Sequence, residues 1–330
     1  MKRPSPHRPG LRQVGNALFS LLYLAGLSAG GQQTVFHSEI HLVTLTFSVH
    51  DASGKLVSGL NQDAFQILED GVPQKIVSLA SEAELPHSNG LLVDGSDSQS
   101  KFLKRHTKDV ELFLQQILRP QDQVFAIGFG DHVRLVADLT SSPTQVVDGL
   151  TTYDKGKADF PELDPDPTRS GGTALFDTIY ASVQEKLANA SGHRRVLILF
   201  TDGEENSSAH DEVEAIAAAQ GADVLIYAVR YTQVHHDKPT AGNHQGMANL
   251  KHLAAQTGGA DFDGLNTDLP QDFRQIADEL RSQYSISYYS TNKLNDGSFR
   301  KVVIEPTQAG LSVRARSGYY AGGTQKTTMP

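Results

Sequence analysis

Residues 91–98 read Leu-Leu-Val-Asp-Gly-Ser-Asp-Ser, a short apolar run that stops abruptly at Asp94. Ser96 and Ser98 follow at alternate positions, and an amphipathic helical pattern begins directly afterwards. A buried strand that ends in a carboxylate and two hydroxyls, at the mouth of a helix, is a ready site for a hard cation. Oxygen ligands of this kind suit magnesium, manganese or calcium rather than zinc or copper.

Short apolar runs alternate with helical periodicity from about residue 90 to residue 282. Strands are predicted at 91–93, 124–129, 133–139, 196–200 and 224–229, and the later helices at 174–187, 212–220, 247–256 and 272–281. This alternation predicts an α/β, Rossmann-like domain with a mainly parallel central sheet flanked by helices. Residues 151–172 read as a long, irregular and acidic loop, and loops of this length are often functional.

The segments on either side of this region have the alternation of strands and turns instead. Val43, Leu45 and Phe47 alternate with polar residues, and Asp70-Gly71 predicts a hairpin whose returning strand covers 74–79. The tail after residue 284 has the same character, so we predict that the two flanks pair into one small β domain. The predicted domains are a signal peptide at 1–31, an N-terminal β segment at 38–84, the α/β domain at 88–283, and a C-terminal β segment at 284–320 that pairs with 38–84.

The first thirty residues have the order of a secretory signal peptide. A basic start is followed by a nearly all-apolar run from Ala17 to Leu27 and by small residues, with cleavage expected near Gly30. The alternative is a buried helix of the fold. The chain has no cysteine, and therefore neither disulfides nor the thiol needed for a bacterial lipid anchor. We expect a secreted or periplasmic protein with no membrane span in the mature chain.

The charge balance bears on the class of partner. The 330 residues include 29 Lys and Arg against 38 Asp and Glu, which gives a formal net charge of -9. A nucleic-acid-binding protein needs a basic face to neutralise phosphates, so we expect no nucleic-acid partner. A hydrophobic fraction of 38% is typical of a folded globular chain.

Three segments place oxygen side chains at predicted strand ends or helix starts. Ligands of open α/β sheets bind at the carboxyl ends of the strands. The segments are Asp94-x-Ser96-x-Ser98, Ser170-Gly171-Gly172-Thr173, and Phe200-Thr201-Asp202-Gly203. Each alone is weak evidence, because Ser, Thr and Asp also favour turns and helix caps. All three in this order are hard to obtain by chance.

With these three segments, residues 89–281 resemble the von Willebrand factor type A domain family and its metal-ion-dependent adhesion site. The resemblance implies that Ser96 and Ser98 are direct ligands through their hydroxyls, and that Thr173 is a direct or water-bridged ligand. Asp94 and Asp202 would hold the coordinating waters or enter the coordination sphere. Mg²⁺ is the cation it implies first, with Mn²⁺ or Ca²⁺ as alternatives.

Asp97 departs from the small residue that is commoner at its place in the motif. If it points inward it adds negative charge, and otherwise it faces solvent or caps the following helix.

The flanking segments resemble those of one bacterial subgroup of this family. The segment around Asp70-Gly71, the Tyr-rich strand at 284–289 and the ending at 314–320 look like the exported von Willebrand factor A-related proteins known from acidobacteria.

Other polar clusters have plainer interpretations. His235, His236 and Asp237, with His244 and His252, match no metal-ligand spacing and read as a solvated loop. The acidic residues from Asp154 to Asp166 lack the spacing of a calcium loop and read as a solvated loop beside the partner site.

The function predicted from these features is an exported, adhesion-type binding module and not an enzyme, with no catalytic residue and no organic cofactor. It would recognise a protein or peptide whose acidic residue completes the coordination of a cation held by Asp94, Ser96, Ser98, Thr173 and Asp202. One alternative is a metal-dependent hydrolase of phosphoesters or peptides, with Asp97 or Glu204 as its base. Another is a structural envelope component whose metal only stabilises the fold.

Overall fold

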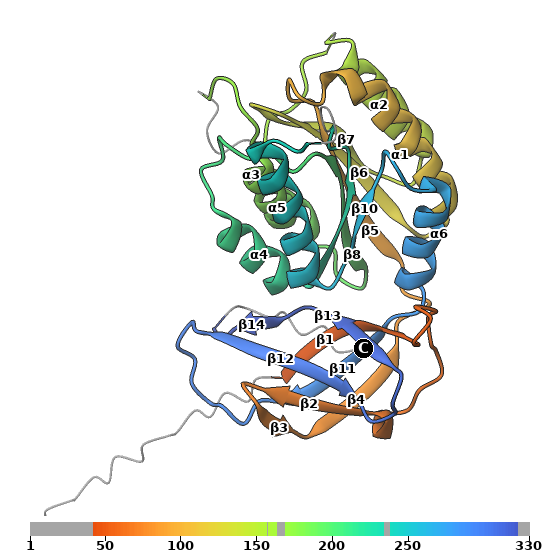
Figure 1. Cartoon of the computed structure of the whole chain (residues 1–330), viewed down its shortest axis with the longest axis vertical. Helices are drawn as coiled ribbons and strands as arrows, with labels where there is room; N and C mark the ends of the chain where they lie inside the picture. Colours follow the sequence, from red (N-terminus) through yellow and green to blue (C-terminus); the bar gives the residue numbers. More distant parts are fainter. Residues whose placement is uncertain (1–41, 157, 164–168, 234–237, 323–330) are drawn as a thin grey trace, which may run out of the picture. The chain divides into compact units, whose positions relative to one another are not determined.

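The computed structural model describes residues 42–156, 158–163, 169–233 and 238–322 (Figure 1). The predicted signal peptide at 1–31 lies outside these residues, as do His235, His236 and Asp237. Among the described residues, none of the helices has both the length and the apolar character that crossing a membrane requires.

A six-stranded sheet in the order β10-β9-β8-β5-β6-β7 forms the centre of the α/β domain. Its strands are β5 (His87–Asp94), β6 (Gln123–Phe129), β7 (Val133–Thr140), β8 (Arg194–Thr201), β9 (Val224–Arg230) and β10 (Asp261–Asp263). All neighbours are parallel except the β6–β7 hairpin. Every residue of β5 is buried, because helices cover both faces of the sheet. The chain leaves β5 toward β6 on one side and later returns to β8 on the other.

Two groups of helices cover the sheet (Figure 1). One face packs against α1 (Leu103–Ile117), α2 (Pro143–Asp154) and α6 (Leu269–Leu280). The other packs against α3 (Leu175–Ala181), the π-helical turn η3 (Ser182–Leu187), α4 (Glu212–Gly221) and α5 (Ala241–Thr257). Each group encloses its own hydrophobic cluster, and alternate residues of β5 point into the two clusters.

The prediction that the irregular loop begins at residue 151 was wrong, because a helix continues to Asp154. Helix α2 occupies the first four residues of the predicted irregular loop at 151–172. The helix begins at Pro143 after Ser142, whose hydroxyl accepts a hydrogen bond from the Gln145 amide at 3.4 Å. Only Val146 and Leu150 are buried along it, so its apolar period is too sparse to stand out in the sequence.

The two flanks form a β sandwich of two four-stranded sheets. One sheet has the order β13-β1-β11-β4, from β13 (Ser312–Ala315), β1 (Leu42–His50), β11 (Tyr284–Tyr289) and β4 (Ile76–Ser81). The other has the order β14-β12-β2-β3, from β14 (Gly318–Tyr320), β12 (Phe299–Pro306), β2 (Phe65–Glu69) and β3 (Val72–Gln74). Antiparallel pairs of β1 with β11 and of β2 with β12 join the flanks, and both sheets share one core. The predicted fold class is therefore confirmed.

The predicted returning strand at 74–79 is divided between the two sheets. Residue Asp70 adopts φ +49° and Gly71 φ +81°, which makes the predicted tight hairpin between β2 and β3. The chain then leaves this sheet after Gln74 and enters the other as β4, which pairs with β11. An uninterrupted polar and apolar alternation does not reveal such a change of partner.

Candidate metal centre

The carboxyl ends of β5 and β8 bring Asp94 and Asp202 together. The two strands pair in parallel, with Val93 opposite Phe200, so Asp94 and the residues after Phe200 leave the sheet at the same edge. This edge lies where the strand order reverses, which is the usual ligand site of an open α/β sheet. Asp94 is fully buried and Asp202 is 4% exposed.

A chain of hydrogen bonds links four of the five predicted metal-site residues. The Ser96 amide donates to Asp94 Oδ1 at 2.9 Å. The Ser96 and Ser98 hydroxyls lie 3.3 Å apart, and the Ser98 hydroxyl donates to Asp202 Oδ2 at 2.8 Å. Because the Ser98 proton is directed to Asp202, Ser96 is the donor between the two serines. Each of the two hydroxyl oxygens keeps at least one lone pair that accepts no hydrogen bond here, and these lone pairs are available to a cation.

Thr173 reaches the same edge of the sheet through backbone contacts. Its amide donates to Asn206 Oδ1 at 2.8 Å, and the Asn206 amide donates back to its carbonyl at 3.2 Å. Asn206 belongs to the loop that follows Asp202. The next amide, of Ala174, donates to the Gly130 carbonyl at 2.8 Å, and Gly130 lies against the backbone of Ser96. No hydrogen bond is found between the Thr173 side chain and the other four residues in the described part of the chain.

The electrostatics of the cluster are dominated by two carboxylates in a buried place. Burial, and then the neighbouring Asp202 carboxylate, raise the pKa of Asp94 to about 7. Burial and Asp202 also raise the pKa of Glu204, which is half-buried. In the described part of the chain, neither Asp94 nor Asp202 forms an ion pair with a basic side chain. The charge of this pair is therefore left to a cation or a proton to balance.

The donor set fits a hard divalent cation. Its side-chain ligands are carboxylate and hydroxyl oxygens only, which suit Mg²⁺, Mn²⁺ or Ca²⁺. Within the described residues, no group of three or more His, Cys, Asp or Glu side chains is arranged to hold a metal ion. The predicted centre differs from such groups because it combines only two carboxylates with hydroxyls.

Two further side chains contact the carboxylates and were missed as site residues by sequence reasoning. The Thr201 hydroxyl donates to Asp94 Oδ2, and the Gln99 amide nitrogen donates to Asp202 Oδ2 at 2.6 Å. Thr201 ends β8 directly before Asp202, so its place at a strand end was the available signal. Gln99 carried no signal, because a glutamine at the start of a helical pattern normally faces solvent.

The two candidate bases of the hydrolase alternative lie differently. Asp97 is exposed, which agrees with the solvent-facing interpretation, and its side chain does not cap the following helix. Glu204 follows Asp202 in the same loop, and its amide donates to Asp202 Oδ1 at 3.1 Å.

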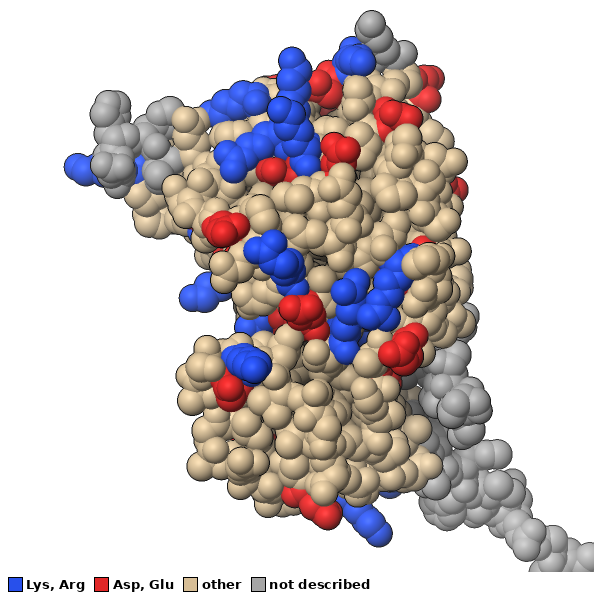
Figure 2. Space-filling model, turned by 90° about the vertical axis from the view of Figure 1, so that its right-hand side faces the viewer, with Lys and Arg blue, Asp and Glu red and all other residues tan. Residues whose placement is uncertain are grey.

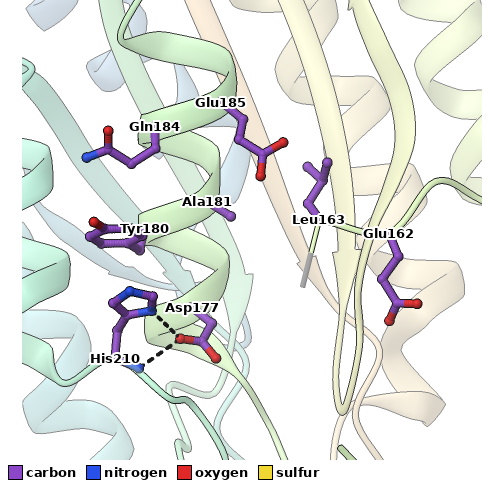
Figure 3. Close-up of a pocket in the computed structure, with 8 residues that line it drawn as sticks. All are labelled: Glu162, Leu163, Asp177, Tyr180, Ala181, Gln184, Glu185 and His210. Carbon is purple, nitrogen blue, oxygen red and sulfur yellow. Dashed lines mark hydrogen bonds and ion pairs between the residues drawn. The ribbon is translucent and has the colours of Figure 1, made fainter. Parts of the chain in front are cut away.

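A separate pocket of about 250 Å³ lies beside α3 and η3 (Figure 3). His210 stacks on Tyr180 with 3.8 Å between ring centroids, and Glu185 points toward the segment that carries Leu163 and Glu162. At its base, Asp177 accepts hydrogen bonds from the His210 ring at 2.7 Å and from the Ala209 amide at 2.8 Å. None of the five predicted metal-site residues lines this pocket.

The surface charge on the face drawn in Figure 2 is mixed, with acidic residues lying among the basic ones.

Of the histidines considered as metal ligands, His244 is exposed on α5, and the Nδ1 atom of His252 lies 2.9 Å from Glu212 Oε1.

Comparisons with known proteins connect this geometry to a family. The family model of the von Willebrand factor type A domain matches residues 90–263, more than half of the chain. The comparison with curated proteins gave no match. BatB from Bacteroides thetaiotaomicron is a similar solved structure, with 16% identity, a TM-score of 0.46, and coverage of 59% of this chain and 100% of BatB.

Two further solved structures are similar at comparable distance. A von Willebrand factor type A protein from Catenulispora acidiphila has 12% identity and a TM-score of 0.44, covering 87% of this chain and 74% of that one. Proximal thread matrix protein 1 from the mussel byssus, solved with a zinc-occupied adhesion motif, has 14% identity and a TM-score of 0.42, covering 61% and 48%. These similarities are too distant to carry a function from any of the three proteins.

Proposed function

Because the chain belongs to the von Willebrand factor type A domain family, we propose that it is an exported module that binds a protein or peptide through a divalent cation. The cation is held by Asp94, Ser96, Ser98, Thr173 and Asp202. Mg²⁺ is the expected ion, and Mn²⁺ and Ca²⁺ are the alternatives. Export to the periplasm or the exterior rests on the predicted signal peptide at 1–31.

One observation carries the proposal: two buried carboxylates face two serine hydroxyls at the edge of the sheet, and among the described residues no basic side chain pairs with them. A buried carboxylate pair is costly without a compensating charge. A divalent cation supplies that charge, and at such a centre it also attracts a carboxylate from outside. Ser98 is exposed, so the cluster opens to solvent on the side of this residue.

The chemistry of the donors indicates what a partner would contribute. Neutral hydroxyls in contact with the ion leave its positive charge poorly compensated, whereas two carboxylates in direct contact would neutralise it. An Asp or Glu side chain of a protein or peptide can therefore complete the coordination. Asp202 accepts the Ser98 hydroxyl proton, which would leave the lone pairs of the Ser98 oxygen to the ion, and Asp94 would hold waters bound to it.

Calorimetric titration of Mg²⁺, Mn²⁺ and Ca²⁺ into the mature protein tests the cation site. We expect the parent protein to bind, and the Asp94→Ala and Asp202→Ala variants each to lose at least about tenfold in affinity, as is usual when a carboxylate of a metal site is removed. Asp138→Ala serves as the control, because Asp138 is an exposed carboxylate whose ion pair, in the described part of the chain, is with Lys186. Binding of equal strength in all four proteins would contradict the proposal.

A peptide array probed in Mg²⁺ and again in EDTA tests the partner class. Retention of peptides that contain Asp or Glu, only when the cation is present, is the expected result. Retention that survives EDTA and the Asp94→Ala change would place recognition elsewhere on the molecule.

A further inference from the structure

Gln99 lies against the candidate metal centre but outside the set of residues predicted from the sequence. It directly follows Ser98 and precedes the short 3₁₀ turn η2 (Ser100–Phe102), and only 1% of its surface is exposed. Its amide nitrogen donates to Asp202 Oδ2 at 2.6 Å and to the Tyr231 carbonyl at 3.4 Å. Both partners are acceptors, so the amino group of the amide, and not its oxygen, must face Asp202.

This contact fills one oxygen of the Asp202 carboxylate. A carboxylate oxygen offers about two lone pairs, and Oδ2 already accepts from both Ser98 and Gln99. Oδ1 accepts one further bond, from the Glu204 amide at 3.1 Å. Asp94 is different, because among the described residues each of its oxygens accepts a single hydrogen bond, Oδ1 from the Ser96 amide and Oδ2 from the Thr201 hydroxyl. Asp202 is thus the more fully occupied of the two carboxylates.

The position of Gln99 is held by a buried aromatic group. Tyr231, whose carbonyl takes the second amide contact, is fully buried, and its hydroxyl donates to Asp109 at 2.7 Å. Its ring packs against His106 with 4.3 Å between centroids. The Gln99 side-chain oxygen is buried and accepts no hydrogen bond from the described residues. A buried oxygen without a hydrogen-bond donor lowers the stability of the fold, and an apolar side chain here would not have this cost. The contribution of the Gln99 amide is therefore its hydrogen bond to Asp202.

We propose that Gln99 sets the cation preference of the centre by keeping Asp202 Oδ2 out of direct coordination, so that Asp202 can offer the ion no more than one oxygen. This inference rests on the proposed cation site. Mg²⁺ retains its waters and requires near-octahedral geometry, so a carboxylate that acts through a bound water suits it. Ca²⁺ takes six to eight oxygens and favours direct carboxylate contacts. With Oδ2 occupied by two donors, Asp202 cannot contact the ion through both oxygens as Ca²⁺ favours, and the centre favours Mg²⁺ over Ca²⁺.

Replacement of Gln99 by methionine tests the inference, because Met has similar length and no hydrogen-bond donor. Calorimetry on the mature protein gives the dissociation constants for Mg²⁺ and Ca²⁺, and the measured quantity is the Ca²⁺ to Mg²⁺ ratio of these constants. We expect this ratio to fall about tenfold in Gln99→Met, the size of effect seen when an outer partner of a metal ligand is lost. Gln99→Glu keeps the shape, removes the amide protons and adds a carboxylate. It should move the ratio in the same direction.

Gln220→Met is the matched control. Gln220 is also 1% exposed, and its amide donates to the Gln256 carbonyl at 2.8 Å and to the Ser317 hydroxyl at 3.2 Å, away from the metal centre. The Ca²⁺ to Mg²⁺ ratio of dissociation constants in Gln220→Met should equal that of the parent. An unchanged ratio in both Gln99 variants would overturn the role of Gln99 and leave the cation site standing. Absence of cation binding in the parent would overturn the proposed function and this inference together.

Discussion

His87 begins the strand that ends at the candidate metal centre, and it is buried as a neutral group. It is 2% exposed, and its ring nitrogen Nδ1 has no hydrogen-bond partner among the described residues. Burial lowers the pKa of His87 to about 4, Asp122 opposes this shift, and Arg194 adds to it. A histidine in such a place resists protonation because its charged form would lose its hydration without gaining an adequate partner.

The pH dependence of stability follows from this lowered pKa. Between about pH 6.5, the ordinary value, and about pH 4, the unfolded chain binds a proton at His87 that the folded chain does not. The free energy of unfolding therefore falls as the pH decreases through this window, by about 3 kcal/mol from this one group. Urea denaturation in EDTA should show a smaller loss from pH 7 to pH 4 in His87→Leu than in the parent. His244→Leu, which removes an exposed histidine, should behave as the parent, and equal slopes in all three proteins would contradict the assignment.

At the scale of the elements, helix α5 fixes the loop that carries Asp202. Gly203 adopts φ +80°, and a Cβ at this position would lie 2.3 Å from the Gly246 carbonyl oxygen. A Cβ on Gly246 would in turn lie 2.5 Å from the Asp202 carbonyl oxygen. Asn249 adds a hydrogen bond from its side chain to the Gly203 carbonyl at 3.0 Å. Helix and loop thus meet backbone to backbone, which only glycine permits.

Gly246→Ala should separate the helix from this loop. The added methyl group meets backbone atoms that cannot rotate away, so we expect a loss of about 2 kcal/mol in the free energy of unfolding and weaker Mg²⁺ binding. Gly221→Ala in α4 is the control, because a Cβ there meets no atom within 4 Å. That change should leave cation binding unaltered and raise stability by up to about 1 kcal/mol. Mg²⁺ affinity equal to that of the parent in Gly246→Ala would show that α5 does not position Asp202.

At the scale of the whole molecule, buried ionic groups tie together segments that are distant in the sequence. Glu279 of α6 is fully buried. Its carboxylate accepts a hydrogen bond from the Ser48 hydroxyl of β1 at 2.8 Å and two from Arg314 of β13, at 2.8 and 3.0 Å. The C-terminal helix of the α/β domain is therefore bound to strands from both flanks.

Removal of this carboxylate should be strongly destabilising. Glu279→Ala leaves Arg314, whose side chain is 34% exposed, and Ser48 without this acceptor, and loss of the buried side of such a partly exposed pair costs about 2 kcal/mol. Denaturant titration followed by circular dichroism measures the loss. The ion pair of the exposed Asp138 with Lys186 gives the comparison, and Asp138→Ala should cost less than about 1 kcal/mol. A loss of similar size in the two variants would mean that Glu279 contributes no more than a surface charge.

The sequence alone determined the local order of this protein. Apolar alternation defined β1 and β11, buried runs defined β5, β8 and β9, and the turn signal Asp70-Gly71 placed the β2–β3 hairpin. The same local signals placed Asp94 and Asp202 at strand ends, because each follows an apolar run of its strand. A parallel sheet then brings such ends to one edge, and the structure lays Ser96 and Ser98 between the two carboxylates.

Only the tertiary structure decided which polar groups are buried and what they contact. Gln99 meets Asp202 across 103 positions of sequence, and Ser48 meets Glu279 across 231. Glu69, which precedes the hairpin, is buried with the hydroxyls of Tyr288 and Tyr319 as its donors. Periodicity reports the face on which a residue lies within its own element, but the burial of a polar side chain depends on the partner that another element supplies.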